Sequence, residues 1–223
     1  MHYLIVAAHP DDEVLGAGGT IRRLVDEGNT VDLAVMCMGV AVRYNISDSL
    51  SEDMAEAQRI LGVSRVYPAD FPNIQMNTVP HLRLVQFVEK ALADSGAEVV
   101  ITHHPADTND DHVQTSHAAA AAVRLFQRRP GIAPLRQLLY MEIPSSTEWA
   151  LDSSANRFTP NYFVEIHERG VEAKLAALAA YKGVSRPYPH PRSPEAVTAL
   201  ALWRGAQAGC DRAEAFEEVF RRE

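Results

Sequence analysis

Short apolar runs that alternate with amphipathic segments constrain the fold of this chain more than any other feature. Runs of strand length occupy 3–8, 31–38, 65–69, 98–102, 137–142 and 162–166, and several are apolar without alternation. Strands have this pattern when helices cover both of their faces. Helical patterns at 13–27, 51–61, 80–94 and 111–127 separate the runs. The order predicts an α/β fold, with a Rossmann-like, mostly parallel sheet and helices on both faces.

The region from residue 168 onwards has a different pattern. Segments 169–181 and 193–208 have helical patterns, and the proline-rich stretch 186–194 joins them. We expect residues 168–223 to form a C-terminal helical appendage that packs on the same domain. The length of 223 residues fits one domain, so we predict a single domain over 1–223.

Charge and composition disfavour several kinds of partner. Lys and Arg number 21 against 29 Asp and Glu, and the formal net charge of −8 disfavours nucleic acid and anionic membrane surfaces. Cys37 and Cys210 are far apart, which excludes a disulfide framework or a cysteine zinc site. No apolar stretch is long enough to span a membrane. We expect a soluble, cytoplasmic protein that acts on a small molecule, and the sequence leaves open whether copies assemble into a homo-oligomer.

Polar side chains gather directly after two of the predicted strands. Segment 8–13 reads Ala-His-Pro-Asp-Asp-Glu after the first strand, and segment 102–112 reads Thr-His-His-Pro-Ala-Asp-Thr-Asn-Asp-Asp-His after the fourth. Open parallel sheets bind their ligands at the carboxyl ends of the strands. We therefore expect the functional site of this chain at that edge of the sheet.

The residue types in these clusters indicate a metal. His9 and Asp12 can converge on one ion from a tight turn that enters a helix, and His112 can supply a third ligand. Two His, one Asp and a water form a hydrolytic zinc site, and the same ligands suit Fe²⁺. Asp11 would then act on the water. The alternative is that the acidic run only complements the positive end of a helix, which does not account for His9 or for the second cluster.

The glycines at 16, 18 and 19 do not form a dinucleotide-binding motif. The third glycine of that motif would fall on Ile21, and the glycines lie inside the predicted helix and not in the turn before it. We expect them to allow close packing of the first helix. The P-loop and the Gly-x-Ser-x-Gly elbow are both absent from the sequence.

The segment His9-Pro10-Asp11-Asp12-Glu13, together with Leu15-Gly16 and Gly18-Gly19-Thr20, resembles the signature of the LmbE-like / PIG-L zinc N-deacetylases. Segment 107–112 is similar to the second motif of that family, which ends in Asp-His. Stretches 102–104, 142–149, 187–193 and 203–205 resemble a subgroup linked to sugar and polysaccharide biosynthesis. The resemblance therefore extends over nearly the whole chain.

The resemblance implies a metal-dependent hydrolase that removes an N-acetyl group from a small molecule containing an amino sugar, such as a sugar, a sugar nucleotide or a glycoconjugate precursor. It implies His9, Asp12 and His112 as metal ligands and Asp11 as general base. Zn²⁺ is the expected cofactor, with Fe²⁺ or another divalent metal as alternatives. A metal-dependent amidase for a non-sugar N-acyl substrate is the alternative function.

Some positions depart from the family pattern or suggest contacts with substrate. Asn109 stands where many relatives have a His that helps to stabilise the transition state, so Asn109 is a candidate catalytic residue. Asn73 stands where relatives often have Asp in a substrate loop. Guanidinium groups suit phosphate and carboxylate oxygens, and prolines lower the entropic cost of presenting side chains. The remaining candidate substrate contacts are Arg43, His190, Arg192 and Arg204. For the two arginines of the tail, the alternative is that they form ion pairs that fasten the tail to the domain.

Overall fold

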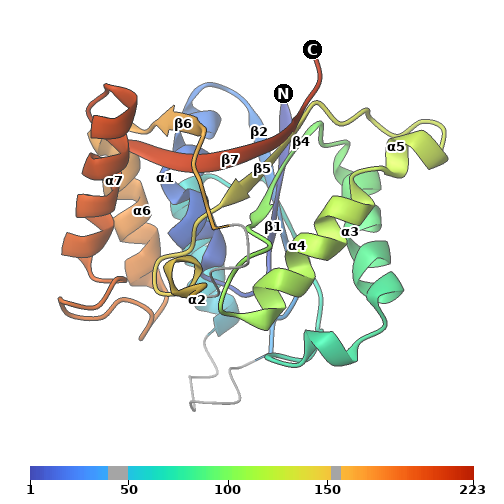
Figure 1. The fold of residues 1–223 in the computed structure, drawn as a ribbon, viewed down its shortest axis with the longest axis horizontal. Helices are drawn as coiled ribbons and strands as arrows, with labels where there is room; N and C mark the ends of the chain where they lie inside the picture. Colours follow the sequence, from blue (N-terminus) through green and yellow to red (C-terminus); the bar gives the residue numbers. More distant parts are fainter. Residues whose placement is uncertain (40–49, 152–156) are drawn as a thin grey trace.

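The computed structural model describes residues 1–39, 50–151 and 157–223. Within these ranges one sheet has the strand order β3-β2-β1-β4-β5-β7-β6 (Figure 1). Neighbours from β3 to β5 are parallel, whereas β7 is antiparallel to both β5 and β6. This arrangement confirms the predicted mostly parallel α/β fold. The strands are β1 (His2–Ala7), β2 (Thr30–Val35), β3 (Arg65–Pro68), β4 (Val99–His103), β5 (Gln137–Met141), β6 (Tyr162–Glu165) and β7 (Ala213–Arg221).

Helices cover both faces of the sheet, with α1, α6 and α7 on the left and α3, α4 and α5 on the right in Figure 1. Helix α2 packs against the same apolar core as α1. Two short 3-10 helices, η1 and η2, lie in loops. The bounds are α1 (Asp12–Asp26), α2 (Leu50–Leu61), η1 (Met76–Thr78), α3 (His81–Ser95), α4 (Asp110–Ala122), α5 (Leu125–Arg128), η2 (Thr147–Trp149), α6 (His167–Ala180) and α7 (Pro194–Ala208).

Strand β1 shows why the apolar runs lack alternation. Tyr3 and Ile5 belong to the core under α1, α2 and α6, whereas Leu4 and Val6 belong to the core under α3 and α4. Successive side chains of a strand point to opposite faces, and here both faces are buried. The buried positions of the strand, from Tyr3 to Ala7, are therefore all apolar.

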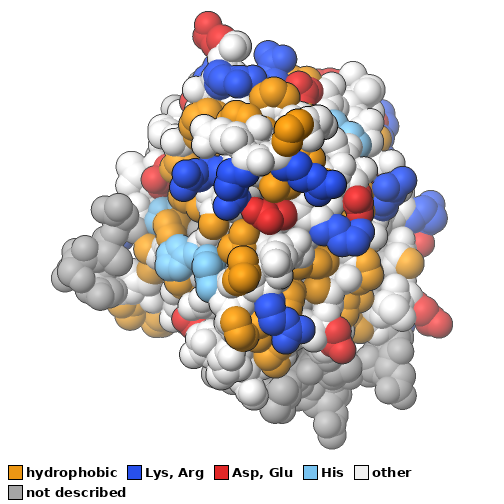
Figure 2. Space-filling view, turned by 90° about the vertical axis from the view of Figure 1, so that its right-hand side faces the viewer, with side chains coloured by type: hydrophobic (Ala, Val, Ile, Leu, Met, Phe, Trp, Pro, Cys, Tyr) orange, Lys and Arg blue, Asp and Glu red, His pale blue; other side chains and the backbone are white. Residues whose placement is uncertain are grey.

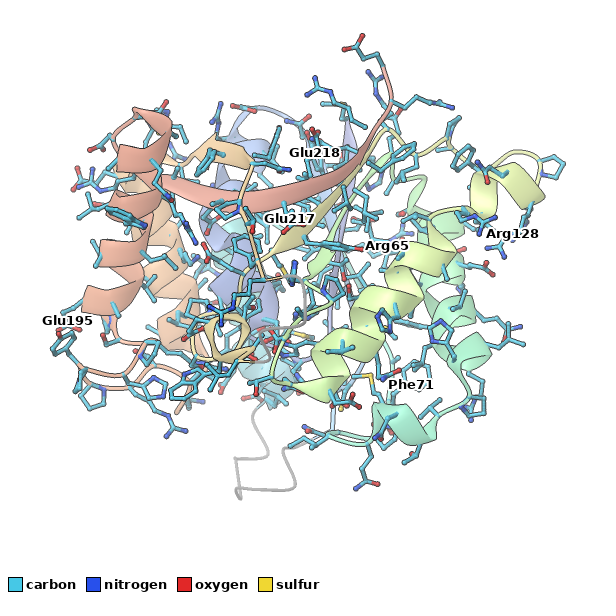
Figure 3. All side chains as sticks on the ribbon, viewed as in Figure 1. Arg65, Phe71, Arg128, Glu195, Glu217 and Glu218 are labelled. Carbon is cyan, nitrogen blue, oxygen red and sulfur yellow. The ribbon has the colours of Figure 1, made fainter. Side chains whose placement is uncertain are left out.

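The outer surface over α3, α4 and α5, seen in Figure 2, mixes Lys and Arg side chains with Asp and Glu side chains and with apolar ones. Arg128 of α5, labelled in Figure 3, pairs with Glu89 of α3 on this side. Among the helices that the structure describes, none has both the length and the apolar character needed to cross a membrane.

The tail contains a strand that the sequence analysis did not predict. Helices α6 and α7 match the two helical patterns, but β7 follows them and inserts between β5 and β6. Three acidic residues weaken the strand signal of β7, because acidic side chains are depleted in strands. The structure gives each of them a partner: Glu214 pairs with Lys174, Glu217 with His104, and Glu218 accepts a hydrogen bond from Gln137. Figure 3 labels Glu217 and Glu218 on β7.

The glycines of α1 allow the close packing that the sequence analysis predicted. A Cβ atom on Gly16 would lie 2.5 Å from Sδ of Met141, and one on Gly19 would lie 2.6 Å from Cδ1 of Ile166. These distances are shorter than real side-chain contacts. Helix α1 therefore lies directly on β5 and on the junction between β6 and α6.

A buried ion pair fastens the tail to α1. Nζ of Lys174 on α6 donates to Oε1 of Glu214 at 2.6 Å and to the backbone oxygen of Leu15 at 2.8 Å. The Glu214 carboxylate on β7 also accepts the backbone N–H groups of Gly19 and Thr20, at 3.0 and 2.7 Å. The pair joins α6 and β7 to the helix that begins at Asp12.

Replacing Lys174 by Met should lower the free energy of unfolding by about 3–5 kcal/mol, because the substitution leaves Glu214 buried without its cation. Urea denaturation measures this change. The matched control is Lys90→Met, which removes an exposed ion pair with Asp94 and should change stability by less than about 1 kcal/mol. Equal effects of the two substitutions would show that the buried pair does not fasten the tail.

Candidate metal centre

The two polar clusters meet where the strand order of the sheet reverses. Strand β1 lies between β2 and β4, and open α/β sheets bind ligands at such a point. His9 lies in the turn between β1 and α1, Asp12 is the first residue of α1, and His112 lies in the first turn of α4. One potential ligand atom from each of these three residues lies within 4.8 Å of the other two.

The geometry of the imidazoles fits a metal ligated by three side chains. Oδ2 of Asp12 lies 3.3 Å from Nδ1 of His9 and 3.3 Å from Nε2 of His112. The other ring nitrogens face carboxylates: Nε2 of His9 lies 3.0 Å from Asp111, and Nδ1 of His112 lies 3.2 Å from Asp107. Histidines that ligate metals commonly donate their second N–H group to a carboxylate, which fixes the tautomer and the ring orientation. These residues therefore fit a divalent metal.

The electrostatics of the cluster also favour a cation. Burial alone would raise the pKa of Asp12, but the His112 imidazolium and hydrogen bonds from His112 and His9 hold that pKa well below its usual range. Burial likewise opposes protonation of His112, but Asp12 and Asp107 outweigh it and raise the pKa of His112 to about 10. The cluster stabilises positive charge between its side chains. A bound metal would take the place of the protons on the imidazoles.

Asp11 lies beside this cluster in an unusual backbone conformation. Its φ angle is 105°, and its N–H group donates to Oε2 of Glu13 at 3.1 Å. Its carboxylate accepts a hydrogen bond from Nη1 of Arg192 at 3.1 Å. Burial and the Asp12 carboxylate raise the pKa of Asp11 to about 7, although Arg192 opposes the shift. A carboxylate with a pKa near neutrality suits a general base.

Glu13 connects Asp11 to the packing of the helices. Its Oε1 accepts hydrogen bonds from Tyr181 Oη at 2.6 Å and from Gln58 Nε2 at 2.5 Å. Burial raises the pKa of Glu13 to about 7. The two donors come from the end of α6 and from α2, so these helices help to hold the turn that carries Asp11.

Residues of the loop after β5, which lie far from His112 in the sequence, hold the carboxylate that faces His112. Asp107, which faces His112, accepts hydrogen bonds from Ser146 Oγ at 2.5 Å and from Thr147 Oγ1 at 2.8 Å. Burial would raise the pKa of Asp107, but hydrogen bonds from His112 and Ser146 lower it to about 2. Sequence reasoning assigned no role to Asp107 or to its hydroxyl partners. Their only signal was that they lie in stretches that resemble the family.

A cavity of about 340 Å³ opens onto the cluster, a size typical of small-molecule sites. Asn73, Asn109, His190 and Arg192 line it together with the three candidate ligands and Asp11. The structure therefore brings these predicted residues together. Asn109 is also the N-cap of α4, because its Oδ1 accepts the N–H group of Asp111 at 3.0 Å.

Two predicted contacts have a different outcome. Arg204 is absent from the residues that line the cavity in the described part of the chain. It forms hydrogen bonds of 2.8 and 2.6 Å with the carboxylate of Glu142, so it fastens α7 to the end of β5. This placement is the structural alternative that the sequence left open for the arginines of the tail. Arg43 lies outside the described residues.

Comparison with known proteins identifies the family. Residues 4–123 match the family model "PIG-L: GlcNAc-PI de-N-acetylase". The chain belongs to the PIG-L family. This PIG-L family member is 31% identical over 188 residues to the uncharacterized deacetylase YaiS of Escherichia coli K12, and the match covers 80% of this chain and 89% of YaiS. It is 24% identical over 197 residues to diacetylchitobiose deacetylase of Thermococcus kodakarensis, and this match covers 80% of this chain and 68% of the Thermococcus protein.

A solved structure supports the fold of this PIG-L family member. The conserved protein TT1542 from Thermus thermophilus superposes with a TM-score of 0.82 at 27% sequence identity. The match covers 99% of this chain and 96% of that chain. The resemblance inferred from the two motifs is thereby confirmed.

Replacing Asp107 by Asn should weaken zinc binding about 10–100-fold, because His112 loses the carboxylate that fixes its tautomer. Competition with a chromogenic chelator measures the affinity. His112→Ala gives the limit of a lost ligand, and its zinc content by elemental analysis should fall to near zero. The matched control is Asp110→Asn, an exposed neighbour at the start of α4, which should bind zinc as the wild type does. Unchanged affinity in Asp107→Asn would contradict the supporting role of Asp107.

Proposed function

We propose that this PIG-L family member is a metal-dependent N-deacetylase that removes an acetyl group from a small molecule containing an amino sugar. The observation that carries the proposal is the Asp11 carboxylate, which Arg192 holds in the same cavity that the convergent side chains of His9, Asp12 and His112 line. The description of the family model and the name of the Thermococcus relative, both of which refer to acetylated amino sugars, support the substrate class. Zn²⁺ is the metal we propose, because imidazole and carboxylate ligands with one open position suit it.

Amide hydrolysis at this site would combine a bound metal with two residues of the chain, each with a separate role. A bound metal would polarise the acyl carbonyl and lower the pKa of water. Asp11 would accept a proton from the attacking water and could return it to the amine that leaves. The side-chain N–H₂ group of Asn109 would donate a hydrogen bond to the oxyanion, because the helix cap uses only the Oδ1 atom of Asn109.

Arg192 would have two roles, because it would bind the substrate and also position Asp11. Its Nε donates to Ser145 Oγ at 2.7 Å, and its Nη1 lies 3.1 Å from Asp11. A guanidinium held at two points can still offer N–H groups to hydroxyl, carboxylate or phosphate oxygens of a substrate. His190, whose Nδ1 accepts the backbone N–H group of Arg192, and Asn73 line the same cavity. We propose all three as substrate contacts, and Arg43 stays a prediction.

We also propose that residues 1–223 form one domain. Strand β7 of the tail lies inside the sheet, and the Lys174–Glu214 pair joins the tail to α1. Separate unfolding of residues 168–223 in a denaturation experiment would contradict this proposal.

Acetate release tests the proposed function directly. The zinc-loaded protein should release acetate from N-acetylated amino sugars or sugar nucleotides, and removal of zinc by a chelator should abolish the release. N-acetyl amino acids are the comparison substrates. Turnover of N-acetyl amino acids alone would instead support the alternative, a metal-dependent amidase for non-sugar substrates.

Replacing Asp11 by Asn should lower kcat about 10²–10⁴-fold at unchanged zinc content, because an amide of the same shape cannot accept the proton of water. Steady-state kinetics and elemental analysis measure the two quantities. A variant that retains more than about a tenth of the wild-type turnover at full zinc content would show that Asp11 is not the base.

Replacing Asn109 by Ala should lower kcat about 10²–10³-fold with little change in KM, because the transition state loses a hydrogen-bond donor. Asn109→Ser is the control for the helix cap, since Ser caps helices well, and a melting temperature near that of the wild type is expected for it. A large rise in KM at unchanged kcat in Asn109→Ala would make Asn109 a substrate contact instead.

A further inference from the structure

Residues in the left-handed backbone region gather at the cavity. Asp11, Ile74 and Ser145 have φ angles of 105°, 57° and 75°, and all three line the cavity. The remaining non-glycine residue of this kind in the described ranges is His167, with φ of 53°, which lies at the start of α6 and outside the cavity lining. Such conformations are unfavourable for L-amino acids and concentrate at functional sites.

Carboxylates hold the three strained residues in place. Each of them donates its backbone N–H group to a carboxylate oxygen of a nearby acidic residue. The bonds run from Asp11 to Glu13 at 3.1 Å, from Ile74 to Asp111 at 2.5 Å, and from Ser145 to Glu148 at 2.6 Å. Acidic side chains thus hold these three positions of the cavity wall, and hydrogen bonds to ionised carboxylates are the stronger kind.

Ile74 is the least expected of these residues. A β-branched side chain in the left-handed region is a genuine outlier, and glycine or asparagine would fill the position with less strain. The carboxylate oxygen that accepts the N–H group of Ile74, Oδ2 of Asp111, also lies 3.0 Å from Nε2 of His9. A single oxygen atom therefore links the backbone of Ile74 to a candidate metal ligand.

Ile74 is 41% exposed where it lines the cavity. The lining that Ile74 shares includes polar side chains such as those of Asn73 and Asn109 and further apolar ones such as those of Leu50 and Val184. An apolar side chain kept in a strained conformation in this lining offers a surface on which a ligand can bury aliphatic carbon. The strain would then be retained for binding and not for stability.

We propose that Ile74 packs against the aliphatic part of the substrate next to the scissile amide and thereby sets substrate specificity. This inference rests on the proposed function. The aliphatic surface belongs either to the acyl group or to the C–H face of the sugar ring, and both offer the same chemistry to Ile74. Arg192 is the proposed contact for polar atoms of the substrate and Asn109 the proposed donor to the oxyanion, and Ile74 adds an apolar contact.

The test compares Ile74→Asn with Ile74→Val in the zinc-loaded protein. Asparagine tolerates the left-handed region and removes the apolar surface. The melting temperature of Ile74→Asn should therefore equal or exceed that of the wild type, while kcat/KM for acetate release falls at least about tenfold. Ile74→Val removes one CH₂ group and should stay within about fourfold of the wild type. The matched control, His167→Asn, relieves the same kind of strain outside the cavity and should leave kcat/KM unchanged.

A series of acyl groups on the same sugar shows whether Ile74 contacts the acyl group or the C–H face of the sugar ring. If Ile74 contacts the acyl group, Ile74→Gly should raise the kcat/KM of N-propionyl and N-butyryl substrates relative to the N-acetyl substrate. If Ile74 contacts the sugar ring, Ile74→Gly should lower kcat/KM by the same factor for all three. An active wild type with an Ile74→Asn variant of equal kcat/KM on every substrate would overturn the assignment of Ile74 alone. A wild type that releases no acetate would overturn the proposed function itself.

Discussion

The pairing of β1 with β4 brings the two halves of the site together. Val6 is in register with Thr102, and Thr102 Oγ1 donates to the backbone oxygen of Val6 at 3.0 Å. Beyond the last paired residues, the N–H group of Ala8 donates to Nε2 of His103 at 2.8 Å. Burial and the nearby His112 lower the pKa of His103 to about 3, so its imidazole is neutral and can accept this bond. The loops that follow the two strands therefore start in contact, and their His and Asp side chains converge.

The acidic residues around this point have more than one function each. Asp111 fixes a ring nitrogen of His9 and also accepts the N–H groups of Ile74 and Met76. Asp107 faces a ring nitrogen of His112 and also accepts hydrogen bonds from the hydroxyl groups of Ser146 and Thr147 in the loop after β5. The orientation of the imidazoles and the shape of the cavity wall consequently depend on the same carboxylates. A substitution that removes one of them would therefore disturb the imidazoles of the candidate metal centre and the cavity wall together.

The sequence predicted the sheet and the residues of the centre because both follow from local patterns. Apolar runs such as 3–8 report burial on two faces, and the dense His and Asp motifs occur at strand ends. The supporting residues could not be assigned in this way. Ser146 contacts Asp107, and Tyr181 contacts Glu13, across 39 and 168 positions of the chain. Neither contact follows from a local pattern, and only Ser146 lies in a stretch that resembles the family. Strand β7 was missed for a related reason, since its acidic residues suit a strand only once Lys174 and His104 face them.

The position of β7 in the sheet has a consequence for the order in which the fold is completed. Strand β6 has β7 as its sheet neighbour, and β7 lies much later in the sequence. During synthesis, the backbone groups of β5 and β6 that pair with β7 therefore stay unpaired until β7 has been made. Exposed strand edges invite pairing with other chains, and partly made chains are prone to aggregate. A product truncated before residue 213 would keep the motifs of the candidate metal centre in its sequence and would still leave the edges of β5 and β6 that pair with β7 open.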